Sequence, residues 1–96
     1  MVTLHIEHPV RDFDTWKSAF DGDPIRRERG GVRRYRVFRP LDDMRYILVD
    51  LEFDDLIAAT AFQAALQELW RSPQAANALG GTPQARILDV VEDVAL

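Results

Sequence analysis

The sequence predicts an α+β domain whose elements follow the order strand, helix, strand, strand, helix, strand. Apolar and polar residues alternate in several short stretches, which is typical of strands with one buried face. Two other stretches repeat apolar residues every three or four positions, which is typical of helices packed on one side. The 96 residues suit one core, so we expect a single domain over residues 1–96.

The stretch 44–70 joins the most apolar strand to the longest helix pattern. Its strand has one apolar face and one mixed face, with Ile47, Val49, Leu51 and Phe53 alternating with Tyr46, Leu48, Asp50 and Glu52. Asp54 and Asp55 then suit a helix N-terminus. The helix stripe that follows consists of Ala59, Phe62, Ala65, Leu66, Leu69 and Trp70. The helix is therefore expected to lie on the apolar face of this strand.

The first strand and helix show the same two patterns. Val2, Leu4 and Ile6 alternate with polar residues and predict a strand that ends at Pro9. Asp12 is a plausible N-cap for a short helix with an apolar stripe, composed of Phe13, Trp16 and Phe20. We expect one more helical turn over residues 25–29, closed by the glycines that follow.

Residues 32–39 and the central strand predict a hairpin around the turn 40–43. We expect the register that places Tyr35 and Val37 on the apolar face, because the other register buries two arginines without partners. Arg34 and Arg36 then share the mixed face with Leu48 and Asp50. After the long helix, we expect a short helix over residues 74–79 and a last strand over residues 84–94.

This order predicts a ferredoxin-like βαββαβ fold, with a four-stranded antiparallel sheet and both helices on one face. The other face is expected to carry Leu48, Val32, Phe38 and part of the last strand. Such a partly apolar face needs a cover, and a second copy of the sheet is the simplest one. We therefore expect a homodimer.

Composition limits the function classes. Hydrophobic residues make up 47% of the chain, charged residues 29%, and there is no Cys. No apolar run approaches a membrane span or a secretory signal, so we expect a cytoplasmic protein without a membrane partner. Residues 26–45 hold eight arginines and three acidic residues, although the whole chain has a net charge of −4. Without a recognition motif, we interpret this segment as ion pairs or an anion site rather than a nucleic-acid surface.

Two segments resemble the dimeric α/β-barrel superfamily, which includes antibiotic-biosynthesis monooxygenases and polyketide-cyclase-like proteins. They are GGVRRYRVFRPLDDMRYILVDLEFDD and AATAFQAAL, and the most specific residues are the turn from Arg39 to Asp43 and the step from Glu52 to Asp55. The resemblance implies a dimeric α/β barrel with a cavity between sheet and helices. It also implies a cofactor-independent, monooxygenase- or cyclase-like enzyme for an aromatic or polyketide-like anionic molecule.

His5 is the candidate general base. It is expected on the mixed face, where Asp50 could orient its ring, so we predict His5 and Asp50 as catalytic residues. A lone His on a strand is also a common structural residue. His8, beside Pro9, is interpreted as a solvated edge residue.

Arginines and carboxylates on neighbouring strands form a second candidate set, namely Arg34, Arg36, Asp50 and Glu52. As cross-strand pairs they would organise the sheet; as a binding site, Arg34, Arg36 and Glu52 would hold an anionic substrate. Trp16, Trp70 and Tyr35 are the aromatic candidates for the substrate pocket, although aromatics at helical spacing are usually core. No metal or nucleotide motif is present, so we expect no cofactor.

Two functions compete at this point. The first is an enzyme or binding protein for an aromatic small molecule. The second is a non-catalytic dimerisation or ligand-sensing module, whose charged face is a subunit interface.

Overall fold

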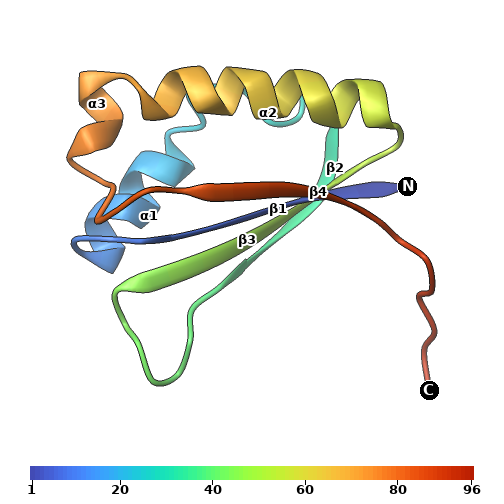
Figure 1. Cartoon of the computed structure of the whole chain (residues 1–96), viewed down its shortest axis with the longest axis horizontal. Coiled ribbons are helices and arrows are strands. Elements are labelled where there is room, and N and C mark those ends of the chain that lie inside the picture. Colours follow the sequence, from blue (N-terminus) through green and yellow to red (C-terminus); the bar gives the residue numbers. More distant parts are fainter.

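A computed structural model describes residues 1–96 and confirms the predicted order of elements (Figure 1). The elements are β1 (Val2–Pro9), α1 (Phe13–Asp21), β2 (Val32–Phe38), β3 (Tyr46–Phe53), α2 (Leu56–Trp70), α3 (Pro73–Ala76) and β4 (Gln84–Asp89). The strands form one sheet in the order β2-β3-β1-β4, and every neighbouring pair is antiparallel. This is the expected ferredoxin-like arrangement.

The predicted hairpin register is confirmed. Tyr35 pairs with Leu51 and Arg36 pairs with Asp50, so the even-numbered arginines of β2 lie on the mixed face of β3. In β1, His5 pairs with Asp50 and His8 pairs with Ile47. Because successive side chains of a strand point to opposite faces, these pairings decide which residues can meet.

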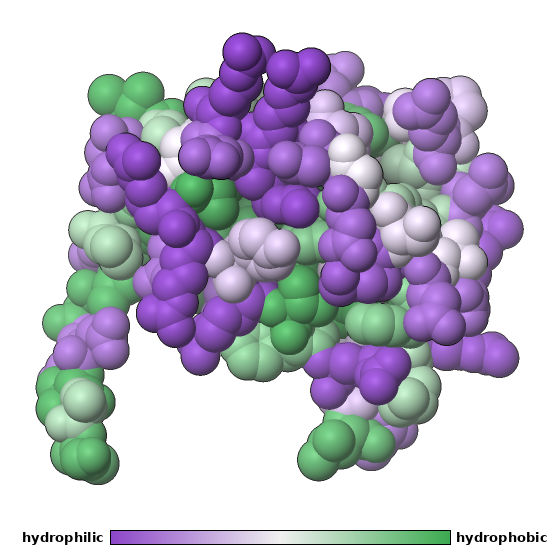
Figure 2. Space-filling model, turned by 180° about the vertical axis from the view of Figure 1, so that it is seen from behind, coloured by the Kyte–Doolittle hydropathy of each residue, from purple (hydrophilic) through white to green (hydrophobic).

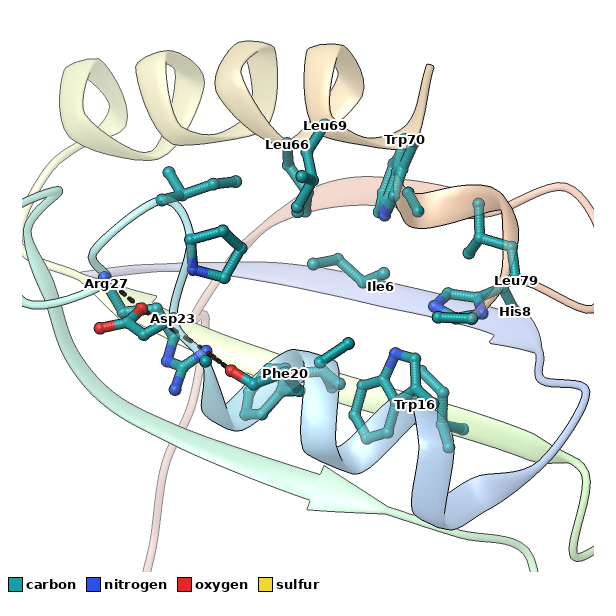
Figure 3. A pocket seen from close by; sticks show the side chains of 18 of the residues that line it. Ile6, His8, Trp16, Phe20, Asp23, Arg27, Leu66, Leu69, Trp70 and Leu79 are labelled. Carbon is teal, nitrogen blue, oxygen red and sulfur yellow. Dashed lines mark hydrogen bonds and ion pairs between the residues drawn. The ribbon is translucent and has the colours of Figure 1, made fainter. Parts of the chain in front are cut away.

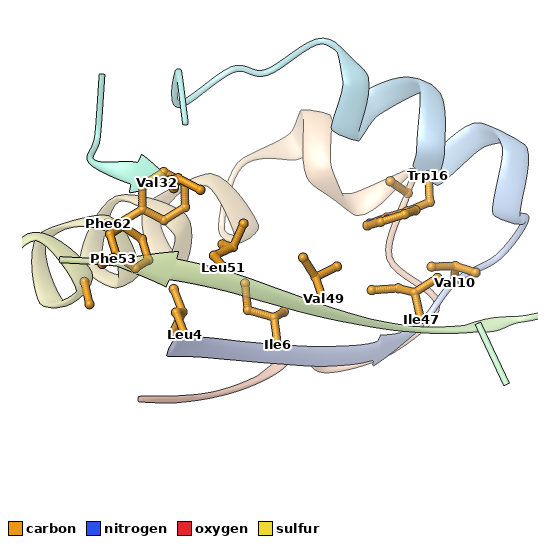
Figure 4. Close-up of a cluster of buried hydrophobic side chains, with 12 residues drawn as sticks. Leu4, Ile6, Val10, Trp16, Val32, Ile47, Val49, Leu51, Phe53 and Phe62 are labelled. Carbon is orange, nitrogen blue, oxygen red and sulfur yellow. The ribbon is translucent and has the colours of Figure 1, made fainter. Parts of the chain in front are cut away.

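Capping residues explain where the two long helices begin. The side chain of Asp12 accepts a hydrogen bond from the backbone N–H of Thr15, and that of Asp55 accepts one from Ala58. Each bond satisfies a backbone donor that has no partner inside the helix. Both helices lie on the same side of the sheet (Figures 1 and 4).

The core lies between that side of the sheet and the helices (Figure 4). Its largest fully buried side chains are Leu4, Ile47, Val49 and Phe53, all on the two central strands. Phe62 of α2 packs on Phe53 with ring centroids 5.5 Å apart. Burial of each large apolar side chain contributes about 1.5–3 kcal/mol, so the central strands anchor the domain.

Two expectations near β2 are wrong. Val32 is buried in the core rather than placed on the mixed face, because a bulge between Val32 and Arg34 changes the side to which the strand points. Residues 25–29 form turns rather than a helical turn. Arg26 has a φ of 60°, which a right-handed helix cannot contain, and the backbone N–H of Arg27 donates to the side chain of Asp23 instead.

The last two elements are shorter than expected. The helix stops at Ala76 because Leu79 leaves it to form a β-bridge with Val10. β4 ends at Asp89, which pairs with Val2, the first residue of β1. A longer β4 would therefore have almost no residue of β1 left to pair with. Residues 90–96 continue as an exposed tail that projects from the body, as does the 39–45 hairpin turn (Figures 1 and 2).

No helix of the chain combines the length and the apolar character that a membrane crossing needs.

Candidate functional site

A cavity of about 310 Å³ lies between the sheet and the helices (Figure 3). Fifteen of its 21 lining residues are hydrophobic, and the wall includes both tryptophans of the chain, Trp16 of α1 and Trp70 of α2. His8, Asp23 and Arg27 are the titratable residues on this wall. We call this space the His8 cavity.

His8 is buried, with only 2% of its surface exposed, so its interpretation as a solvated edge residue is wrong. It follows Leu4 and Ile6 on the face of β1 that the helices cover. Its ring lies in T-shaped contact with the rings of Trp16 and Trp70, at centroid distances of 6.2 and 6.5 Å. The alternation of β1 was the signal in the sequence, since position 8 continues the series 4, 6, 8.

The hydrogen bond of His8 to the backbone fixes the tautomer of its neutral ring. Its Nδ1 lies 2.8 Å from the backbone carbonyl oxygen of Pro9, which can only accept, so Nδ1 carries the proton. Burial lowers the pKa of His8, and this outweighs the bond to Pro9, which raises it. No protein group forms a hydrogen bond with Nε2. Every fully buried polar side-chain atom in the chain has a partner, so Nε2 is not fully buried. Nε2 therefore presents its lone pair to the cavity.

Arg27 and Asp23 lie at the other end of the cavity from His8 (Figure 3). Nη1 of Arg27 donates to the carbonyl oxygen of Phe20 at 2.8 Å and lies 3.6 Å from Asp23 Oδ1. The guanidinium also stacks over the Phe20 ring, 3.9 Å from its centroid. Neither residue has a signal in the sequence that marks it as part of a site, because the left-handed turn at Arg26 that brings them together has no helical or strand pattern.

The predicted site residues fall into separate places. Trp16 and Trp70 line the His8 cavity, whereas Tyr35 does not. Tyr35 is 44% exposed, and its ring lies edge-to-face with the ring of Phe20 at a centroid distance of 5.3 Å. The other candidates lie on the opposite, open face of the sheet, namely His5, Asp50, Glu52, Arg34 and Arg36. They therefore do not share one site with the tryptophans.

On the open face, His5 is the centre of a hydrogen-bonded cluster. Its Nδ1 lies 2.6 Å from Asp50 and its Nε2 lies 2.8 Å from Glu7, which also accepts a hydrogen bond from Tyr46. Burial, the largest single influence, lowers the pKa of His5, but the bonds and charges of the two carboxylates together raise it above its ordinary value. The bond from His5 lowers the pKa of Glu7. Because each ring nitrogen of His5 faces a carboxylate oxygen, the cluster favours the charged imidazolium.

The arginines of β2 pair only in part with the carboxylates of β3. Arg34 Nε lies 3.5 Å from Glu52, but Asp50 is occupied by His5, and Arg36 packs its guanidinium over the Phe38 ring. Across the chain, no three His, Asp or Glu side chains are grouped so that they could hold a metal ion.

Comparisons with known proteins show similarity in fold, but no match to a protein family. No protein-family model matches the sequence, and neither does any curated protein. A provisionally named antibiotic biosynthesis monooxygenase from Nitrosomonas europaea is similar in structure, with a TM-score of 0.73, 17% identity, and coverage of 96% of this chain and 100% of that one. SnoaB, a cofactor-independent oxygenase from Streptomyces nogalater, has a TM-score of 0.71 and 18% identity, with 97% and 95% covered.

A third similar structure is a dimeric ferredoxin-like protein from an uncultured marine organism, with a TM-score of 0.67 and 14% identity over 97% of both chains. The chain shares the ferredoxin-like fold of these structures. The expected fold class is thereby confirmed. At these identities the likeness concerns architecture, and the chemistry of this chain has to be argued from its own residues.

Proposed function

We propose that the chain binds a small aromatic molecule in the His8 cavity. The observation that supports this most is an apolar space walled by two tryptophans, into which one unpaired ring nitrogen points. Ligand pockets are commonly about 300–1,000 Å³, mostly apolar, with a few placed polar groups. A volume of about 310 Å³ is at the small end of that range, so a molecule of up to three fused rings suits it.

The proposal extends to a cofactor-independent, monooxygenase- or cyclase-like reaction on a polyketide-like aromatic. The neutral ring of His8 can accept a proton from an acidic hydroxyl or C–H group at Nε2, and the apolar wall strengthens electrostatic interactions there. The structural likeness to a cofactor-independent oxygenase supports testing this class first. The alternative is a ligand-sensing module that binds the molecule and does not change it.

Binding can be measured at the cavity wall itself. Trp16 and Trp70 are the only tryptophans, so the two indole N–H signals of a ¹⁵N-labelled sample both report on the cavity. Titration with naphthalene and 1-naphthol should shift both signals in a saturable manner. If neither probe moves them at millimolar concentration, the binding proposal fails.

Turnover can be measured with anthrone in air. Oxygenation would consume one dioxygen, remove two hydrogens from the substrate and add one oxygen, giving anthraquinone and water. A rate above the protein-free control, reduced at least tenfold in His8→Asn, would support an enzyme. Saturable binding of 1-naphthol without any conversion of anthrone would favour the ligand-sensing alternative.

We further propose that a second copy covers the open face of the sheet. The central strands place acidic Glu7 and Asp50 on this face, and the outer strands place basic Arg36 and Arg86 there. Such opposite charges allow an isologous pair to match basic strands with acidic ones. The tail and the 39–45 turn project on the side away from α2 and expose large apolar residues, among them Leu41, Met44, Val91 and Val94.

A charge placed on the open face should test the dimer. Leu48→Glu replaces an apolar side chain beside Glu7 and Asp50 with a charge that the interface would have to desolvate, so we expect the dimer to dissociate at micromolar concentration in analytical ultracentrifugation. Leu56→Glu, at an exposed position on α2, is the matched control and should remain dimeric. A monomeric wild-type protein at the same concentration would contradict the proposal.

A further inference from the structure

We propose that the molecule recognised by the His8 cavity is a neutral phenol-type aromatic, whose hydroxyl group donates a hydrogen bond to Nε2 of His8. This inference rests on the proposed function and specifies its ligand class. It differs from the anionic ligand that the arginine-rich segment suggested, because Arg34 and Arg36 lie on the open face of the sheet. The charges of the cavity itself therefore decide what it accepts.

The position of the His8 ring is fixed by backbone groups. The carbonyl oxygen of Pro9 accepts from His8 Nδ1 at 2.8 Å and from the backbone N–H of Gly80 at 3.0 Å. The adjacent bridge between Val10 and Leu79 holds the two segments together. A ring whose Nδ1–H is fixed in this way has its lone pair on Nε2 at a fixed place on the cavity wall.

An acceptor at this place selects a donor. A phenol hydroxyl can donate to Nε2 while its ring packs against Trp16 and Trp70, which flank His8. An aromatic hydrocarbon leaves Nε2 without a partner after the cavity water has been displaced, and this is unfavourable. An ionised carboxylate has no proton to donate and would place its charge against a lone pair in an apolar wall.

The far end of the cavity does not reverse this preference. Arg27 is the only cation on the wall, and the carboxylate of Asp23 lies 3.6 Å from it. One of its amino groups is already engaged by the Phe20 carbonyl, and its plane lies on the Phe20 ring. The pair adds no net charge, so the cavity contains no uncompensated cation for a carboxylate.

The test compares three probes of equal ring size by the shifts of the two indole signals. We expect 1-naphthol to bind about tenfold more tightly than naphthalene, which is the ratio that one good hydrogen bond supplies, and 1-naphthoate to bind more weakly than either. If none of the three binds, the proposed function itself fails. If naphthalene binds as tightly as 1-naphthol, or if 1-naphthoate binds best, only the ligand class is overturned.

Two substitutions separate the nitrogens of His8. The amide of His8→Asn can replace Nδ1–H as donor to Pro9 but supplies no acceptor at the place of Nε2, so the preference for 1-naphthol should fall to within about twofold. His8→Gln can supply an oxygen near that place and should retain a preference. A purely structural His8 predicts the same preference in all three proteins, which would overturn the inference. The dispersed amide spectrum of each variant verifies that it is folded.

The preference should also depend on pH. Protonation converts Nε2 into a donor, so the advantage of 1-naphthol over naphthalene should decline when the pH falls below the pKa of His8, which burial lowers. The charged groups facing the cavity, Asp23 and Arg27, lie at its other end, and neither contributes to the shift of His8. An unchanged preference in acid would contradict the role of the lone pair.

Discussion

His5 and His8 lie three residues apart on β1 and face opposite sides of the sheet. His5 is held between the carboxylates of Glu7 and Asp50 on the open face, whereas His8 is enclosed by Trp16 and Trp70. The two carboxylates raise the pKa of His5 despite its partial burial, and burial lowers the pKa of His8. The contributions of the two rings to stability should therefore change with pH in opposite directions.

The stabilising effect of His5 should be lost in alkaline solution. Because its pKa is raised in the folded state, its contribution is fully present below about pH 6.5 and declines as the pH rises through the folded-state value. The free energy of unfolding of wild type and His5→Gln can be measured in urea at a fixed protein concentration. Wild type should be more stable than the variant, and the difference should be larger at pH 6 than at pH 9. Equal differences at the two pH values would show that the carboxylate cluster does not hold a charged imidazole.

His8 should show the opposite dependence. Its lowered pKa means that the unfolded chain binds more protons between the folded-state value and about pH 6.5, so stability should fall as the pH decreases through this window. Ring-nitrogen NMR should show the Nδ1–H tautomer at neutral pH and a midpoint below 6.5. An Nε2–H tautomer would contradict the arrangement of the cavity.

Gly80 should be required for the position of His8. A Cβ atom at this residue would lie 2.8 Å from the backbone carbon of Val10, so Gly80→Ala must displace the segment that bonds Pro9. We expect a loss of about 1–3 kcal/mol in the free energy of unfolding and weaker binding of 1-naphthol. Gly22→Ala is the control, because its φ of −64° suits alanine and its nearest contact is 3.3 Å. Its stability should remain within about 0.5 kcal/mol of wild type.

Adjacent aspartates at the start of α2 should differ in importance. Asp55 caps the helix through the N–H of Ala58, so Asp55→Ala should cost about 1 kcal/mol in chemical denaturation. Asp54 forms only an exposed ion pair with Arg33, whose effect should be smaller, about 0–1 kcal/mol, and reduced by salt. Equal, salt-sensitive losses in both variants would indicate that charge, rather than capping, supports this end of the helix.

Local patterns were sufficient for most of the fold. Alternation in β1 and β3, helical spacing around Phe62, and the caps Asp12 and Asp55 depend on neighbours within a few residues, so they can be recognised in the sequence. The hairpin register also followed, because only one register avoids burying Arg34 and Arg36. The bulge after Val32 has no local signal in the sequence, and it turns the side chain of Val32 to the face opposite to the predicted one.

The composition of the site required the tertiary structure. The alternation of side chains along β1 already placed His5 and His8 on opposite faces. It did not show that His8 would be enclosed by two helices that are distant in the sequence. It also did not show that a left-handed turn would bring Arg27 to the other end of the cavity. Within the regular parts of the strands, the sequence determined which residues share a face, because that depends on backbone geometry alone. Long-range packing decided which face holds the cavity wall, because burial and hydrogen-bond partners depend on segments that meet only in the folded chain.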